Sequence, residues 1–158
     1  MKVLISSCVY GNNVRWNGSH KLSQEFVDWA ARVGIKLVPV CPEHELFGTP
    51  RKPIRLQSVE GRTVASMGAD DVYHQLNDKA QEIHSRHPDA VGFIGIARSP
   101  SCGLAVGVRK LGKTIKAPMH SKATFPTTEI NQLKTTRGRT LFLDRVVKYL
   151  SYKALKDK

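Results

Sequence analysis

The chain contains three cysteines, and each follows a short apolar run. The runs are residues 3–5 before Cys8, residues 36–40 before Cys41 and residues 91–96 before Cys102. Short apolar runs of this kind are typical of buried β-strands. Because the carboxyl ends of parallel strands meet at one edge of a sheet, thiols that lie 33 and 61 positions apart can share one site. The spacing therefore indicates that the three thiols act together.

The chemistry of three thiols points to a metal centre with an open position. Thiolate sulfur is a soft ligand that favours zinc, cuprous copper or iron–sulfur clusters. A closed structural zinc site needs four ligands, often in C-x-x-C pairs, and this chain has no such pair. Two alternatives compete: a lone cysteine is often a small buried hydrophobic residue, and thiols also form disulfides. The odd number of cysteines and the absence of a signal peptide disfavour a disulfide.

A polar loop over residues 11–20 leaves the first cysteine and enters the first predicted helix. It lacks the G-x-G-x-x-G pattern of a phosphate loop, but Arg15 could hold an anionic ligand there. Trp16 is a candidate for stacking on a base, although most aromatic side chains belong to the core. His20 is a candidate proton donor, and a surface histidine at a helix start is the commoner role.

Composition is that of one globular domain. The chain has 158 residues, of which 41% are hydrophobic, and no apolar stretch is long enough to cross a bilayer. We find no internal repeat, low-complexity block or linker that divides it, so we expect residues 1–158 to form a single domain. Without a targeting segment, the expected location is the cytoplasm.

Positive charge is concentrated in the C-terminal third. The net charge is +12 overall, and residues 1–104 contribute +2 whereas residues 105–158 contribute +10. Such a field attracts polyanions or phosphorylated small molecules. The alternative is that lysines of a C-terminal helix and tail only keep the surface soluble.

The hydrophobic pattern predicts an α/β protein. The expected elements are strands over 2–6, 35–40 and 90–97, helices over 21–33, from near 70, and over 139–153, a possible edge strand over 62–66 and a further strand over 104–109. We expect Leu22 and Val33 on the core face of the first helix, and Val147 on that of the last. Residues 42–53 are expected to be irregular, and residues 112–138 have no clear assignment. Alternating strands and helices favour a three-layer, Rossmann-like fold, in which helices cover both faces of a mainly parallel sheet.

Several motifs together resemble one known family. They are residues 7–8 (SC), 14–20 (VRWNGSH), 38–43 (VPVCPE), 49–51 (TPR) and 98–103 (RSPSCG). In this order they resemble the thiouracil desulfidases, over about residues 1–110. Residues 125–129 and 142–146 are similar to the end of this domain in two-domain relatives, so the chain would correspond to the catalytic domain alone.

The resemblance implies a 4Fe-4S cluster bound by Cys8, Cys41 and Cys102, with the fourth iron open. It also implies a hydrolytic, non-redox removal of sulfur, with Glu43 as general base and Ser99 as the second polar catalytic residue. Ser101 is the weaker choice for that second role. Taken alone, Glu43 and Ser99 would more often be a loop carboxylate and a turn residue.

The implied substrate is a thiolated uracil. The positive charge favours a phosphorylated form such as 4-thiouridine monophosphate, with Arg15, Arg51 and Arg98 as phosphate contacts. Thiolated transfer RNA is the alternative substrate. Two other classes stay open: a non-catalytic, metal-stabilised RNA-binding module, and an electron-transfer protein, which usually has four cysteine ligands. Neither the oligomeric state nor the choice between 2-thio and 4-thio substrates follows from the sequence.

Overall fold

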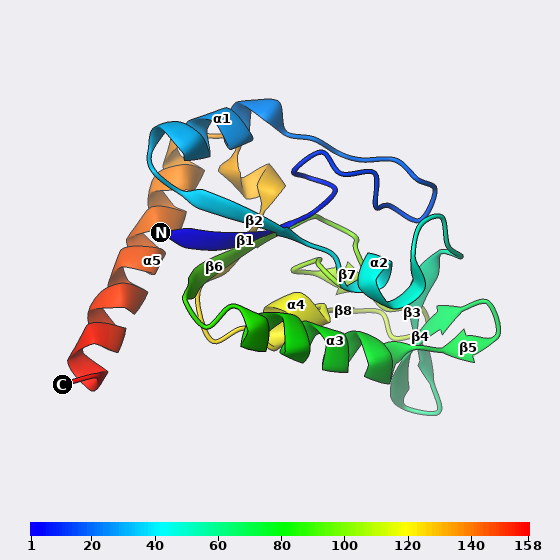
Figure 1. The fold of residues 1–158 in the computed structure, drawn as a ribbon. Helices are drawn as coiled ribbons and strands as arrows, with labels where there is room; N and C mark the ends of the chain where they lie inside the picture. Colours follow the sequence, from blue (N-terminus) through cyan, green and yellow to red (C-terminus); the bar gives the residue numbers. More distant parts are fainter.

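The computed structural model describes residues 1–158 as alternating strands and helices (Figure 1). The strands are β1 (Lys2–Ser6), β2 (Lys36–Val40), β3 (Ile54–Val59), β4 (Arg62–Met67), β5 (Asp70–Asp71), β6 (Ala90–Gly95), β7 (Val106–Gly107), β8 (Thr114–Ile115) and β9 (Thr127–Glu129). The helices are α1 (Gln24–Arg32), α2 (Pro42–Phe47), α3 (Tyr73–Arg86), α4 (Pro118–Ser121), the 3₁₀ helix η1 (Ile130–Leu133) and α5 (Thr136–Lys156).

The central sheet has the strand order β2-β1-β6-β9, and all of its pairs are parallel. On one face, Phe26 of α1 and Phe142 of α5 join a core cluster with Val3 and Ile5 of β1. On the other face, Ala80 and Ile83 of α3 pack with Leu4 and Phe93. Buried strands between two helical layers confirm the three-layer Rossmann-like fold that the sequence predicts.

The chain reverses its direction across the sheet beside β1. From β1 it crosses through α1 to β2 on one side, and from β2 it crosses through α3 to β6 on the other. The carboxyl ends of β1 and β6 therefore form a topological switch point, which is where open α/β sheets bind ligands. Cys8 and Cys102 follow these two strands, and Cys41 follows β2 next to them.

A smaller antiparallel sheet, with the order β3-β4-β5, lies beside the first turns of α3 (Figure 1). Its inner face carries Ile54, Leu56 and Ala65, which form a third core cluster with Leu76 of α3 and Val106 of β7. The predicted edge strand over 62–66 is wrong in its placement, since β4 is the central strand of this sheet. The prediction of an irregular segment over 42–53 missed α2.

The helix boundaries differ from the predicted ones at both ends of the chain. α1 begins at Gln24, so Leu22 precedes it and is exposed, and Val33 caps its C-terminus and is exposed too. α3 begins at Tyr73 rather than near residue 70, because β5 occupies residues 70–71. α5 is longer than predicted, and Val147 is 54% exposed on it instead of facing the core.

The strand predictions near the cysteines also need correction. β6 ends at Gly95, and of the predicted strand over 104–109 only residues 106–107 form a strand, in a two-stranded ribbon with β8, while Arg109 forms an isolated bridge with Gln57 of β3. The unassigned segment 112–138 contains β8, α4, β9 and η1. Thus the fourth strand of the central sheet lies in a stretch that sequence patterning did not assign.

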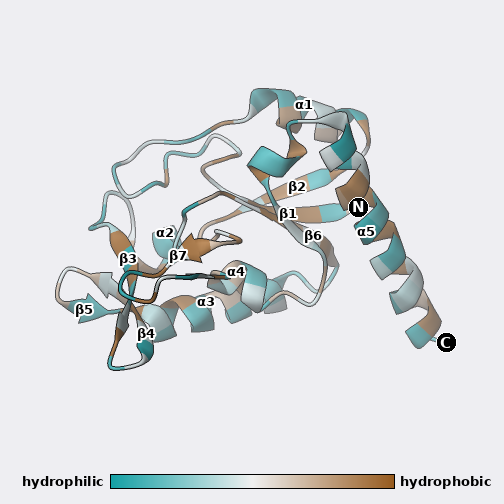
Figure 2. Ribbon diagram, turned by 180° about the vertical axis from the view of Figure 1, so that it is seen from behind, coloured by the Kyte–Doolittle hydropathy of each residue, from teal (hydrophilic) through white to brown (hydrophobic).

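The C-terminal half of α5 extends past the edge of the sheet, and its residues alternate between hydrophilic and hydrophobic (Figure 2). Val146 is the last fully buried residue of this helix, whereas Tyr152 and Leu155 are exposed. No helix of the structure has the length and hydropathy needed to span a membrane.

Candidate active site

The three cysteines line one cavity of about 560 Å³ at the carboxyl edge of the central sheet. All three are free thiols. The wall also contains Glu43 and Ser99, together with residues from the loops that follow β1, β2 and β6. The topology therefore brings together groups from three distant parts of the sequence.

Tight turns fix the backbone of Cys8. The Cys8 carbonyl oxygen accepts hydrogen bonds from the N–H groups of Lys21, at 2.8 Å, and Gly11, at 3.3 Å. Gly11 has φ +108°, a conformation that favours glycine. The loop over residues 11–21 therefore folds back and contacts the Cys8 backbone before α1 begins.

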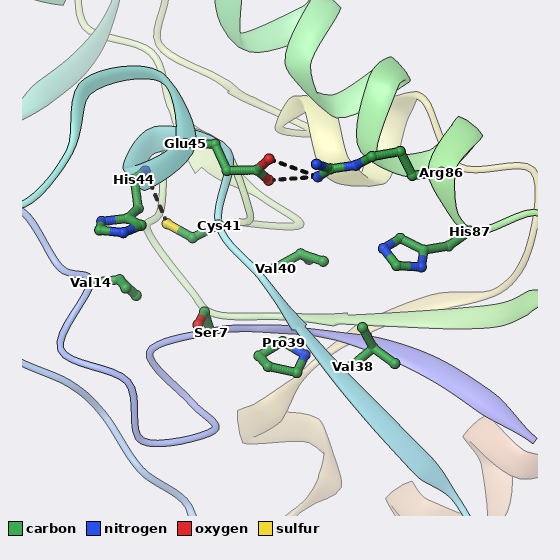
Figure 3. A pocket seen from close by; sticks show the side chains of 10 residues that line it. All are labelled: Ser7, Val14, Val38, Pro39, Val40, Cys41, His44, Glu45, Arg86 and His87. Carbon is green, nitrogen blue, oxygen red and sulfur yellow. Dashed lines mark hydrogen bonds and ion pairs between the residues drawn. The ribbon is translucent and has the colours of Figure 1, made fainter.

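Cys41 is the N-cap of α2. Its Sγ accepts a hydrogen bond from the N–H of His44 at 3.4 Å (Figure 3). Pro42 takes the first helical position. Proline suits this position because it has no N–H that would need a partner. Cys41 also lines a second cavity, of about 680 Å³, along the outer edge of β2, where Glu45 and Arg86 form an ion pair at 2.7 Å. Cys41 therefore lies between two cavities.

Cys102 is held against β6. Its carbonyl oxygen accepts hydrogen bonds from the N–H of Ile96 at 3.2 Å and from Nε2 of the buried His120 at 2.8 Å. At Gly95, an added Cβ would lie 1.9 Å from this oxygen, so only glycine permits the approach. His120 and Gly95 were not among the predicted site residues.

Glu43 is buried and hydrogen-bonded within the site. The Ser101 hydroxyl donates to Oε2 of Glu43 at 2.6 Å. The Ser99 Oγ lies 3.3 Å from the Ser101 Oγ and accepts the N–H of Cys102 at 3.0 Å. Glu43, Ser101 and Ser99 are thus linked by a series of polar contacts that ends at the backbone N–H of Cys102. Within it, Ser101 contacts the carboxylate directly, and Ser99 lines the cavity.

Arg51 contacts the opposite side of Glu43. Its Nε lies 3.6 Å from Oε1 of Glu43, and its Nη1 donates to the carbonyl oxygens of Val14, at 2.8 Å, and Gly48, at 3.0 Å. The Arg51 side chain is only 5% exposed. Its guanidinium is therefore engaged by the protein, although Arg51 was predicted as a phosphate contact.

The other predicted contacts occupy different positions around the cavity. Arg15, Trp16 and Arg98 line it, and Lys21, which was not predicted, does so as well. Trp16 is 45% exposed, and Arg98 has φ +68° in the loop before Cys102. His20 does not line the cavity; its Nδ1 accepts the N–H of Leu22 at 3.1 Å.

Burial raises the pKa of all three thiols. Desolvation is the main cause in each case, and it raises the pKa of Cys41 to about 11. Arg15 partly opposes the effect at Cys8, and Arg51 does so at Cys41. Without a cation, the thiols are therefore protonated at neutral pH, and a bound metal would have to displace their protons.

The donor set fits an iron–sulfur cluster better than a single ion. No three His, Cys, Asp or Glu side chains converge closely enough to hold one metal ion. In a cluster each thiolate binds a different iron, so sulfurs that line one cavity without meeting at a point suit it. The Ser6 hydroxyl, at the wall of the cavity, is buried beside Cys102, where burial raises the pKa of the thiol and a hydrogen bond from Ser6 partly opposes that rise. Such a donor is suited to a cluster sulfur.

Fold and site together define a Rossmann-like domain with a thiol-lined centre at its switch point. A sequence model of the 2-thiouracil desulfurase family matches residues 3–131, and the chain belongs to this family. The match spans the motifs predicted over residues 1–110 and includes residues 125–129, which the sequence analysis assigned to the end of the domain, but it stops before residues 142–146. Membership makes the protein a desulfidase, an enzyme that removes sulfur from thiocarbonyl groups.

The fold is also similar to that of a solved structure. The [4Fe-4S]-dependent thiouracil desulfidase TudS superimposes with a TM-score of 0.64 at 22% sequence identity, covering 84% of this chain and 92% of that one. No curated protein sequence matches the chain.

Proposed function

We propose that this chain is a non-redox desulfidase that converts 4-thiouridine monophosphate to the oxygen form and releases sulfide. The observation that carries the proposal is that three free thiols share one cavity with the buried Glu43, whose carboxylate accepts a hydrogen bond from Ser101. The whole of residues 1–158 serves as a single desulfidase domain.

The proposed cofactor is a 4Fe-4S cluster held by Cys8, Cys41 and Cys102. The similar solved structure is described as [4Fe-4S]-dependent, and the cavity of this chain offers three soft ligands rather than four. When bound, such a cluster supplies an open iron, a Lewis acid for the soft thiocarbonyl sulfur.

The protein side chains handle the water and its protons. Glu43 accepts one proton from a water molecule whose oxygen bonds to the ring carbon. The carbon–sulfur bond breaks as the carbonyl forms, and the two protons of the water end on the released sulfide. No electron is transferred, since C=S and H₂O become C=O and H₂S. Ser101 holds Oε2 of Glu43, and Arg51 lies 3.6 Å from Oε1, so the two residues together fix the orientation of the carboxylate that accepts the proton.

Positive residues at the wall of the cavity favour the phosphorylated substrate. Arg15, Lys21 and Arg98 line the cavity, and none of them forms an ion pair with a carboxylate. Trp16 is half-exposed beside them and offers a face on which a base can stack. A neutral base alone would gain little from this charge.

4-Thiouridine in transfer RNA is the second candidate substrate. The observation that favours it is the excess of ten positive charges over residues 105–158. RNA binding gains from many phosphate contacts, and a single nucleotide needs few.

The test is sulfide release from 4-thiouridine monophosphate by protein that has been reconstituted with iron and sulfide under anaerobic conditions. We expect Glu43→Gln to lose turnover and keep the visible absorbance of the cluster, because Gln retains the shape and the acceptor for Ser101. Cys41→Ala should lose both. Turnover by Glu43→Gln at the wild-type rate would refute the assignment of the base, and failure of the wild-type protein to bind iron would refute the cofactor.

A further inference from the structure

A basic trough of about 310 Å³ lies on the outer face of the antiparallel sheet, beside the cysteine cavity. Its cations are Lys52, Arg55 and Arg109, and its neutral polar side chains are Gln57 and Ser66. No acidic and no hydrophobic side chain lines it. Its chemistry is therefore that of an anion site.

Regular backbone pairing fixes the positions of these side chains. Arg55 lies opposite Ser66 in the β3–β4 register. The backbone of Arg109 pairs beside β3, with its N–H donating to Leu56 at 3.0 Å and its carbonyl accepting from Ser58 at 2.9 Å. The two arginines thus project from neighbouring, hydrogen-bonded segments rather than from free loops.

The three cations have no partner in the protein. None of these three side chains forms a salt bridge or a hydrogen bond with the protein. Other cations of the chain, namely Lys2, Arg86 and Arg139, are each paired with a carboxylate. At Gly68 an added Cβ would lie 3.2 Å from Nζ of Lys52, so glycine there leaves room for the lysine. Three positive charges close together repel one another. A bound anion would replace this repulsion with attraction and charge-assisted hydrogen bonds.

The basic trough adjoins the active-site cavity. Pro53 and Arg55 line both. A ligand whose base reaches the cysteines can therefore extend past Arg55 without leaving the protein surface. The cavity already has Arg15, Lys21 and Arg98 for one phosphate, so the trough supplies charge for another.

We propose that the basic trough binds a second phosphoryl group of the substrate, beyond the 5′-phosphate of the nucleotide that is desulfurated. The inference rests on the proposed function and specifies its substrate as a thiolated uridine with at least two phosphates. The second group is the β-phosphate of a nucleoside diphosphate or the neighbouring phosphodiester of RNA, which share the same chemistry.

Isothermal titration of the reconstituted protein with sulfur-free ligands tests this proposal separately from turnover. The ligands are uridine 5′-monophosphate, uridine 5′-diphosphate and the 5′-phosphorylated dinucleotide pUpU. We expect a ligand with two phosphates to bind roughly tenfold more tightly than the monophosphate, as for hydrogen bonds to charged groups. Arg55→Gln and Arg109→Gln should remove that advantage. Arg62→Gln, on the same sheet but outside the trough, should keep it.

The outcomes separate the two proposals. A gain for the diphosphate alone supports a nucleotide substrate, and a gain for pUpU alone supports RNA. Equal affinity for all three ligands, or an advantage that survives in both trough variants, overturns the inference. Sulfide release from free 4-thiouracil by the wild-type protein tests the proposed function independently, because this base carries no phosphate.

Discussion

Glu43 lies between a hydroxyl and a guanidinium, which leaves its carboxylate little freedom to rotate. Ser101 is 1% exposed and donates to it, while Arg51 contacts its other oxygen. Removal of the Ser101 hydroxyl would leave a buried carboxylate oxygen without its donor.

We therefore expect Ser101→Ala to lower kcat about tenfold and the free energy of unfolding by about 2 kcal/mol. Steady-state sulfide release and urea denaturation measure the two effects, with the exposed Ser85→Ala as the control. If Ser101 acts through Glu43, its substitution should have little further effect on the residual rate of Glu43→Gln. Full additivity of the two substitutions would contradict that role.

His120 makes stability depend on pH. Burial is the main cause that lowers the pKa of His120, to about 4. Between pH 6.5 and 4 the unfolded chain binds a proton at this residue and the folded protein does not, so stability falls as the pH falls. We expect a loss of up to roughly 3 kcal/mol from this residue.

Urea denaturation at pH values from about 6.5 down to about 4 measures this dependence. His120→Gln keeps an N–H donor for the Cys102 carbonyl and cannot titrate, so its stability should vary less with pH. The exposed His20→Gln is the matched control and should follow the wild type. Identical pH profiles for wild type and His120→Gln would rule out the effect.

The sequence predicted the site residues whose chemistry is visible locally. Each cysteine follows an apolar run, and the structure places all three in one cavity, with Glu43 and Ser99 in its wall. His120 and Arg51 show the limit of this reasoning. Their roles depend on contacts with the carbonyl of Cys102 and the carboxylate of Glu43, which no sequence spacing encodes.

At the scale of elements, Gly95 at the end of β6 lets the Cys102 loop pack directly on the sheet. A methyl group there would collide with the Cys102 carbonyl oxygen and with Nε2 of His120. By contrast, an added Cβ at Gly107 of β7 meets nothing within 4 Å.

We expect Gly95→Ala to displace Cys102 and reduce the iron bound per chain, with a lower melting temperature. Gly107→Ala should bind iron as the wild type does. Iron content after reconstitution and thermal melting followed by circular dichroism provide the readouts. Wild-type iron binding by Gly95→Ala would show that the close contact is not required.

The elements that the sequence missed are those whose burial depends on polar partners. β9 has the sequence Thr-Thr-Glu, which does not look like a core strand. It is buried because Thr128 donates to Gln132 and Glu129 accepts the N–H of Leu104. β1 and β6 were predictable because their apolar residues are buried between the two helical layers, whereas β2 is an edge strand in which only Val40 is buried.

At the scale of the whole molecule, the charge of +12 acts on any anionic substrate before contact. We expect the KM for 4-thiouridine monophosphate to rise several-fold as NaCl increases from about 50 to about 200 mM, through screening and release of counterions. The KM for uncharged 4-thiouracil should hardly change. Steady-state kinetics with both substrates at each salt concentration make the comparison, and equal salt dependence would argue against an electrostatic contribution.

Cys41 lines both the active-site cavity and the second cavity along β2. A substrate in the first cavity covers Cys8 and Cys102 but leaves Cys41 accessible from behind. Oxygen and chelators would thus reach the thiol-bound cofactor through the second cavity, which the substrate does not fill. Saturation with substrate should therefore give the enzyme little protection against inactivation in air.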